Sequence, residues 1–273
     1  MSLLVHSFHF STKKISQRDL EEIVAHTLGK KRSELFFENL HFTKIEQDII
    51  ERLISRRELG EPLSLILGEV EFYGCKIELM NGVLIPRLES EFLVEHVLNK
   101  IGNVSGKLLL DLCCGTGCIG LAIKKHLNRL DVILSDISEF CTSLAEKNAK
   151  INNLDVTILT GDFLQPLKNK KIDYLVCNPP YISEKEYITL ENSVKNYEPK
   201  LALVGGNDGL LFYRLLEKQV PLYLKQGGLL FLEIGSTQKN AIEKIFSSEM
   251  WSKKEFIKDL AGLDRFFFMQ YQG

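Results

Sequence analysis

Residues 108–120 read LLLDLCCGTGCIG, an apolar run that ends in a turn of glycines and small residues. An apolar run of this length before a glycine-rich turn predicts a buried strand that leads directly into a helix. Gly115, Gly117 and Gly120 form a G-x-G-x-x-G pattern, and glycines let the backbone of such a turn approach a ligand closely. The stretch therefore predicts the first strand, turn and helix of a nucleotide-binding α/β fold.

Apolar runs and helical patterns alternate after this stretch. The runs that predict strands are DVILSD (131–136), VTILTGD (156–162), IDYLVC (172–177), GGLLFLEIG (227–235) and DRFFFMQYQ (264–272). Helical spacing is found over residues 119–127 and 138–151, and over 208–226 with a kink expected at Pro221. Nearly continuous apolar strands that alternate with helices predict a doubly wound parallel sheet, whose ligands bind at the carboxyl ends of the strands.

The N-terminal part of the chain has a different pattern. RDLEEIVAHTLG (18–29) and TKIEQDIIERLISRREL (43–59) carry apolar residues at helical spacing. Thr43 and Glu46 form a capping-box pattern at the start of the second segment. We therefore expect a small helical domain over residues 1–60.

A glycine-punctuated segment separates these helices from the alternating part. Short β-type runs lie over residues 65–85, between Pro62 and Pro86, and predict a β-hairpin connector that covers residues 61–86. The α/β domain is then expected to cover residues 87–273 and to begin with a helix at about residue 88.

Acidic residues at strand ends predict contacts to a nucleoside. Asp136 ends the second strand, where a carboxylate can accept hydrogen bonds from both ribose hydroxyls. Asp162 and Phe163 follow the third strand, where they can bind an adenine amino group and cover the base. The glycine pattern alone also fits a nicotinamide-dependent oxidoreductase. Asp111 before the turn and the length of the loop favour S-adenosylmethionine.

Asn178-Pro179-Pro180-Tyr181 follows the strand IDYLVC and carries the chemistry. The prolines have no N–H and a fixed φ, so they form a rigid turn with free carbonyl acceptors. The Asn178 side-chain oxygen and the Pro179 carbonyl can bind the two hydrogens of a planar NH2 group and direct its nitrogen at an electrophile. Tyr181 can pack on that group or lie near a sulfonium. We therefore predict Asn178 and Tyr181 as catalytic and all four residues as substrate-binding.

An NPPY sequence at this position resembles methyltransferases that act on amide or exocyclic amino nitrogens. Other segments resemble blocks of the HemK-type peptide chain release factor glutamine N(5)-methyltransferase family: RRELGEPLSLILGEVEFYG (56–74), VLIPRLESEFLVE (83–95), NYEPKLALVGGNDGLLFYR (196–214), LLFLEIG (229–235) and DLAGLDRF (259–266). The resemblance implies a Rossmann-like, seven-stranded S-adenosylmethionine-dependent methyltransferase domain. It also implies a helical domain that docks the release factor, a hairpin connector, and methylation of the glutamine in the Gly-Gly-Gln loop.

The resemblance also implies which residues bind the donor. Carried over by position, they are Cys113, Cys114, Gly115, Thr116, Gly117, Asp136, Asp162, Phe163 and Asn178. Three positions depart from the family pattern. Cys113 replaces a glycine and is acceptable only with a negative φ, while Leu88 and Ser90 stand where the family usually has Pro and Thr. Arg87 and Glu89 fit equally well as lining of the donor pocket or as a structural ion pair.

Charge separates the two possible classes of substrate. Lys and Arg number 34 against 36 Asp and Glu, a formal net charge of -2. A near-neutral chain without an additional target-recognition region does not favour the alternative, an adenine amino-group methyltransferase that acts on DNA or RNA. We expect release factors as the protein substrate, no direct binding to nucleic acid, and a monomer.

Cysteine spacing and hydropathy point to the cytoplasm. The six cysteines show no disulfide framework. Cys114 and Cys118 could form one pair of metal ligands, but no second Cys or His pair stands at a suitable spacing, so we expect buried thiols and no metal. No apolar run is long enough to span a membrane. The first 18 residues lack acids, which leaves an organelle presequence open as the less favoured alternative.

Overall fold

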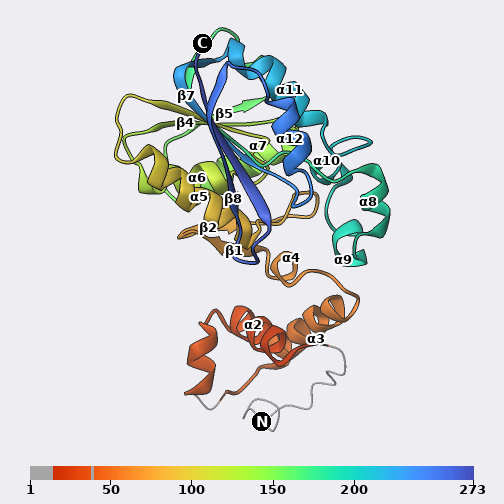
Figure 1. Cartoon of the computed structure of the whole chain (residues 1–273). Coiled ribbons are helices and arrows are strands. Elements are labelled where there is room, and N and C mark those ends of the chain that lie inside the picture. Colours follow the sequence, from red (N-terminus) through yellow and green to blue (C-terminus); the bar gives the residue numbers. More distant parts are fainter. Residues whose placement is uncertain (1–14, 38–39) are drawn as a thin grey trace. The chain divides into compact units, whose positions relative to one another are not determined.

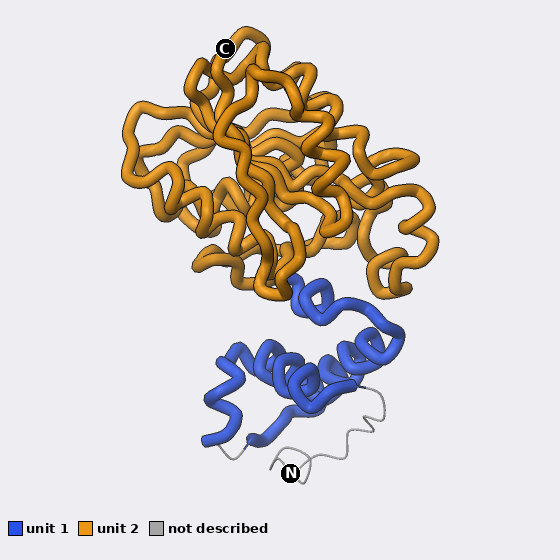
Figure 2. The backbone as a smooth tube through the Cα atoms, in the orientation of Figure 1, with its two compact units in different colours: residues 1–68 blue, residues 69–273 orange. Residues whose placement is uncertain are grey.

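The computed structural model describes residues 15–37 and 40–273 and is shown in Figure 1. The chain forms two compact units, Met1–Gly68 and Glu69–Gly273, which Figure 2 distinguishes by colour. Most of the segment considered above as a presequence lies outside the described residues. The connector predicted over residues 61–86 spans the boundary between the two units. Residues 61–68 belong to the first unit, and both strands of the hairpin belong to the second.

The first unit is helical. Its helices are α2 (Gln17–Leu28), the 3₁₀ helix η1 (Arg32–Phe36), α3 (Lys44–Glu58) and α4 (Leu63–Leu67). Gly29 ends α2 with a left-handed φ of 63°, and the capping box of Thr43 and Glu46 is confirmed at the start of α3. Ile23 and Ile50 are fully buried in the core between these helices. The β-type interpretation of residues 65–67 was wrong, because they form the end of α4.

The second unit is built on a seven-stranded sheet with the order β5-β4-β3-β6-β7-β9-β8. Its strands are β3 (Leu108–Leu112), β4 (Asp131–Asp136), β5 (Thr157–Thr160), β6 (Ile172–Cys177), β7 (Leu224–Glu233), β8 (Trp251–Lys258) and β9 (Asp264–Tyr271). In this order, the strands from β5 to β7 are parallel, and β9 is antiparallel to both of its neighbours, β7 and β8. The predicted α/β fold is therefore confirmed, with an antiparallel addition at one edge.

Helices cover both faces of the sheet (Figure 1). They are α5 (Leu88–Ile101), α6 (Cys118–His126), α7 (Glu139–Ile151), α11 (Leu211–Gln219) and α12 (Lys239–Ile245). Leu110 of β3 shares a buried cluster with Tyr213 of α11 and Ile242 of α12. The next residue, Asp111, points to the opposite face, where its carboxylate accepts a hydrogen bond from the Gly120 N–H of α6.

Shorter elements complete the second unit. The hairpin strands are β1 (Glu69–Phe72) and β2 (Cys75–Glu78), and the 3₁₀ helices are η2 (Gln165–Leu167) and η3 (Val220–Leu222). Three short helices follow β6 and were not predicted: α8 (Glu184–Thr189), α9 (Asn192–Lys195) and α10 (Lys200–Leu203). The long helix expected over residues 208–226 was wrong. Pro221 lacks an N–H, so α11 stops at Gln219 and β7 already begins at Leu224.

The six cysteines are free thiols, and all but Cys113 are buried. Within residues 15–37 and 40–273, no helix combines the length and the apolar character that crossing a membrane requires.

Candidate functional site

Strand register brings the predicted site residues to one edge of the sheet. Leu112, the last residue of β3, pairs with Ser135 of β4 and with Cys177 of β6, and Cys177 pairs with Leu232 of β7. The residues that follow these positions therefore leave the sheet side by side. β4 and β6 flank β3 on opposite sides. The carboxyl ends of these strands therefore form the topological switch point at which α/β folds bind ligands.

The loop after β3 is held in an open turn by Asp136. Gly115 and Gly117 have left-handed φ values of 53° and 79°. The Gly115 N–H donates to Asp136 Oδ2 at 2.9 Å, and the Ser138 N–H donates to Oδ1 at the same distance. A Cβ built on Gly115 meets nothing within 4 Å, so free space lies above the turn. The loop and Asp136 thus form one preorganised unit.

Cys113 departs from what we expected. Its φ is 60°, not negative. Leu112 is paired in register with Ser135, and the Cys114 N–H donates to the Ser135 carbonyl at 3.0 Å, so the chain has to turn within the single residue between them. Left-handed backbone costs a residue with a side chain about 1–2 kcal/mol. The half-buried Cys113 packs against the core cluster that contains Cys177.

Asp111 provides a buried carboxyl group beneath the loop. Its Oδ2 accepts a hydrogen bond from the Gly120 N–H at 2.8 Å, while Oδ1 is buried and has no hydrogen-bond partner among the described residues. Burial raises the pKa of Asp111 to about 7. An unpartnered carboxyl oxygen beside an open glycine turn fits a nucleoside ligand that carries positive charge, as S-adenosylmethionine does.

The residues after β5 lie beside the same loop. The Gly161 N–H donates to the Asp136 carbonyl at 3.0 Å, which joins the ends of β4 and β5. Asp162 is exposed, and its Oδ2 accepts a hydrogen bond from Gln165 Nε2 at 3.0 Å. Phe163 is buried, with its ring centroid 6.2 Å from that of Phe212. Asp162 is therefore available to a ligand at this edge, and Phe163 is mainly a core residue.

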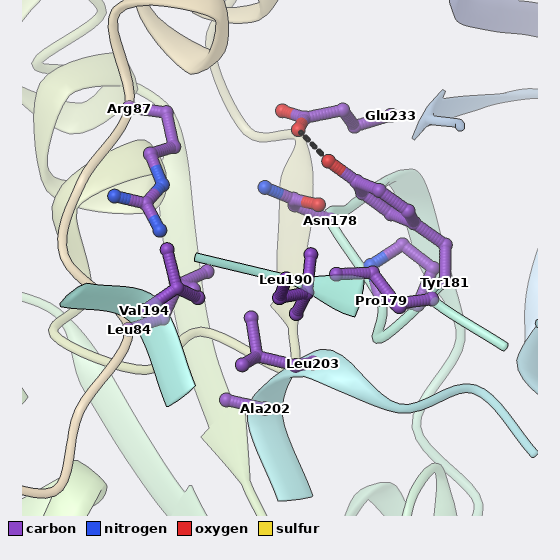
Figure 3. A pocket seen from close by; sticks show the side chains of 11 residues that line it. Leu84, Arg87, Asn178, Pro179, Tyr181, Leu190, Val194, Ala202, Leu203 and Glu233 are labelled. Atoms are coloured by element: carbon purple, nitrogen blue, oxygen red, sulfur yellow. Dashed lines mark hydrogen bonds between the residues drawn. The ribbon is translucent and has the colours of Figure 1, made fainter. Parts of the chain in front are cut away.

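The turn of residues 178–181, which we call the NPPY turn, borders a cavity of about 150 Å³ (Figure 3). The lining residues are Leu84, Arg87, Asn178, Pro179, Tyr181, Ile182, Leu190, Val194, Ala202, Leu203 and Glu233. Most of the apolar wall comes from the segment that holds α8, α9 and α10. A cavity of about 150 Å³ has room for a molecule such as benzene, and so for the end of a side chain.

A buried hydrogen-bond network supports the polar side of this cavity. Asn178 Nδ2 donates to Ser90 Oγ at 3.3 Å, and Ser90 Oγ donates to Glu233 Oε2 at 2.7 Å. The Tyr181 hydroxyl donates to Glu233 Oε1 at 3.4 Å (Figure 3). Burial raises the pKa of Glu233 to about 7, and it also raises the pKa of Tyr181, which keeps the phenol protonated.

Arg87 lies on the other wall of the cavity. Its Nη2 is 2.5 Å from Oε1 of the buried Glu198, whose Oε2 accepts a hydrogen bond from the Ile85 N–H at 3.1 Å. Arg87 is therefore paired with Glu198 rather than with Glu89, which is exposed and does not line this cavity. Glu198 was missed as a site residue because it follows no strand, although it lies in the segment 196–214 that resembles the family.

Glu233 was also missed, although a signal was present. It ends the apolar run LLFLE, just as Asp136 ends DVILS, and the rule that ligand-binding residues follow strands applies to both. Ser90 was noted only as a departure from the family pattern. It keeps the hydroxyl group of the threonine that usually stands there, and that hydroxyl carries the bonds in the network.

Metal ligands are not clustered in this region. Among the described residues, no group of three or more His, Cys, Asp or Glu side chains is arranged to hold a metal ion.

Known families match both units. Residues 88–202 match the Methyltransferase small domain, and residues 8–68 match the PrmC N-terminal domain. The structure of a methyltransferase from Pyrococcus furiosus has the same fold, with a TM-score of 0.55 and 20% identity. The match covers 73% of this chain and 90% of that one.

Curated relatives are similar along nearly the whole chain. The release factor glutamine methyltransferase of Thermodesulfovibrio yellowstonii is 40% identical over 270 residues, which cover 98% of this chain and 95% of that protein. The release factor glutamine methyltransferase of Chlamydia trachomatis serovar D is 40% identical over 261 residues, which cover 95% and 89% respectively. The chain therefore belongs to the release factor glutamine methyltransferase family.

Proposed function

We propose that this chain transfers the methyl group of S-adenosylmethionine to the side-chain amide nitrogen of the glutamine in the Gly-Gly-Gln loop of peptide chain release factors. The observation that carries the proposal is the position of the NPPY turn. Asn178 and Pro179 line a cavity sized for the end of a side chain. Asn178 follows Cys177, which pairs with Leu112 just before the glycine loop, at the switch point of the sheet.

The donor site is proposed at the loop after β3. S-Adenosylmethionine supplies an electrophilic methyl group on a sulfonium when it is bound. The residues proposed to hold it are Cys113, Cys114, Gly115, Thr116, Gly117, Asp136, Asp162, Phe163 and Asn178. The open turn, the strand-end carboxylate of Asp136 and the unpartnered Asp111 Oδ1 support this assignment.

The NPPY turn positions the substrate amide. We expect Asn178 Oδ1 and the Pro179 carbonyl to accept the two amide hydrogens, while the Tyr181 ring packs on the amide plane and Pro180 keeps the turn rigid. The nitrogen lone pair then attacks the methyl carbon in line, the N–C bond forms, and the S–C bond breaks. The nitrogen becomes acidic once it is alkylated and loses a proton to solvent. Orientation supplies most of the rate enhancement, up to about 7–11 kcal/mol in well-aligned systems.

The division of labour along the chain belongs to the same proposal. Residues 1–60 dock the release factor, and residues 61–86 connect the two domains. Residues 87–273 carry out methyl transfer to this factor of translation termination. The net charge of -2 favours a protein substrate over nucleic acid. We propose a cytoplasmic enzyme that acts as a monomer and needs no metal.

Labelled methyl transfer to purified proteins tests this assignment. The chain is incubated with methyl-labelled S-adenosylmethionine and either a bacterial-type release factor, the same factor with its loop glutamine changed to alanine, or double-stranded DNA or RNA. We expect the labelled methyl group to be incorporated only into the release factor that keeps its loop glutamine. Incorporation into nucleic acid at a matching rate would instead assign an adenine amino-group methyltransferase.

Changing Asp136 to alanine tests the donor site. The variant loses the carboxylate that orders Gly115 and that is expected to bind the ribose, so the KM for S-adenosylmethionine should rise about 10- to 100-fold. The KM for the release factor should stay near the wild-type value. Asp131→Ala, at the exposed opposite end of β4, is the matched control and should change neither constant. An unchanged donor KM in Asp136→Ala would place the donor elsewhere.

A further inference from the structure

One buried carboxyl group connects both ends of the NPPY turn. Glu233 is 1% exposed, and its two oxygens are used in different directions. Oε2 accepts a hydrogen bond from Ser90, whose hydroxyl in turn accepts one from Asn178, and Oε1 accepts one from Tyr181. Ser90 of α5 and Glu233 of β7 are far apart in the sequence. Together they bind Asn178 and Tyr181, the two side chains proposed to contact the substrate amide.

The direction of these hydrogen bonds determines which face Asn178 presents. An ionised carboxylate can only accept hydrogen bonds, so the single proton of the Ser90 hydroxyl has to point at Glu233. The lone pairs of that hydroxyl are then left for Asn178, and only the NH2 side of the carboxamide can bind them. Asn178 Oδ1, which has no hydrogen-bond donor among the described residues, is consequently the atom left for the substrate.

We propose that Ser90 and Glu233 are positioning residues that fix the rotation of the Asn178 carboxamide, so that its oxygen faces the substrate amide, and that Glu233 also holds the Tyr181 ring. The inference rests on the proposed function. Both residues are proposed to act through Asn178 and Tyr181 and not on the reacting atoms. Without the network, the carboxamide can rotate by half a turn and present NH2 to the substrate NH2, which places two donors face to face.

Protonation of Glu233 should have the same effect as its removal. A neutral carboxyl group can donate to Ser90, which frees the Ser90 proton to point at Asn178 and allows either rotation. The charges that act on Glu233 are Glu89 of α5, which favours the neutral form, and Arg265 of β9, which favours the ionised form. Burial dominates and raises the pKa to about 7, so the ordering form is lost as the pH falls below 7.

Three variants separate positioning from a purely structural role. Ser90→Ala removes the hydroxyl, Ser90→Thr keeps it, and Glu233→Gln keeps the shape but can donate as well as accept. With saturating S-adenosylmethionine and release factor, we expect kcat to fall about 10- to 100-fold in Ser90→Ala and Glu233→Gln, because a misplacement of about 1 Å can cost about 100-fold. Ser90→Thr should retain near wild-type kcat. The KM for the donor should change little in all three.

The pH profile gives a second readout. In the wild-type protein, kcat should fall with decreasing pH around pH 7, and this inflection should be absent in Glu233→Gln. Thermal unfolding of each variant shows whether the protein is folded at the assay temperature. The wild-type activity on the release factor tests the proposed function itself, so a failure there is distinct from a failure of this inference.

Two results would overturn the positioning role. If folded Ser90→Ala has wild-type kcat, the network does not orient Asn178. If Glu233→Gln loses activity while Ser90→Ala keeps it, Glu233 acts directly on the substrate, for instance as a proton acceptor, and not through Ser90.

Discussion

Asn178→Ala should lower kcat for glutamine methylation by about 100- to 1,000-fold, the loss typical when one preorganised polar group at a reacting centre is removed. The side chain supplies an acceptor that borders the cavity, and alanine leaves the substrate amide free to rotate away from the methyl group. Donor binding should change far less, because Asp136 and the glycine loop remain in place. Single-turnover kinetics with a release factor, together with calorimetric titration of S-adenosylmethionine, measure the two effects separately.

Asn196→Ala provides the control for this substitution. Asn196 is exposed at the end of α9, so its loss changes the surface of the same segment without changing the cavity. We expect wild-type kcat for this variant. Near-normal methylation by Asn178→Ala with intact donor binding would contradict the proposed handling of the substrate amide.

Gly209→Ala should damage both stability and activity. Gly209 has a φ of 74°, and a Cβ at this position would lie 2.2 Å from the Tyr181 carbonyl oxygen and 2.8 Å from Gln238 Nε2. Gln238 Nε2 donates to both the Tyr181 and the Gly209 carbonyls, at 2.8 and 3.2 Å, so it anchors the back of the NPPY turn. The added methyl group has to displace the turn or break this anchor. We expect about 2–4 kcal/mol less stability and at least a 100-fold lower kcat.

Gly262→Ala separates this clash from backbone strain. Its φ of 77° is nearly the same, but a Cβ there meets nothing within 4 Å. This control should lose about 1 kcal/mol of stability and keep its kcat. Chemical denaturation measures the free energy of unfolding of each variant. Steady-state methylation at a temperature where all variants are folded measures kcat. Equal losses of kcat in the two variants would show that contact with the NPPY turn is not the cause.

Strongly periodic segments made most of the fold predictable. The runs before Gly115, Asp136 and Asn178 are apolar because the central strands are buried on both faces, and the glycine turn marks where the first of them ends. The edge strand β8 was missed for the opposite reason. Its central residues are the exposed Lys253, Lys254 and Glu255, so the segment lacks an apolar run.

The site was predictable where one residue type acts through its own chemistry, and not where it acts through a distant partner. The NPPY turn is contiguous, and its acceptors follow from proline and asparagine chemistry. Glu233 and Ser90 are separated by 143 positions and meet only because β7 and α5 pack together. The positive φ of Cys113 depends on the register between β3 and β4, which the local sequence does not encode.

Localisation of the added methyl group shows whether the loop glutamine is the residue that the protein modifies. A release factor is incubated with the wild-type protein and S-adenosylmethionine, and the loop peptide is fragmented by tandem mass spectrometry. We expect one added methyl group on the side chain of the Gly-Gly-Gln glutamine, and none when Asn178→Ala replaces the wild type for the same short time. A methyl group on another residue, or an unmodified loop after prolonged incubation with active donor, would contradict it.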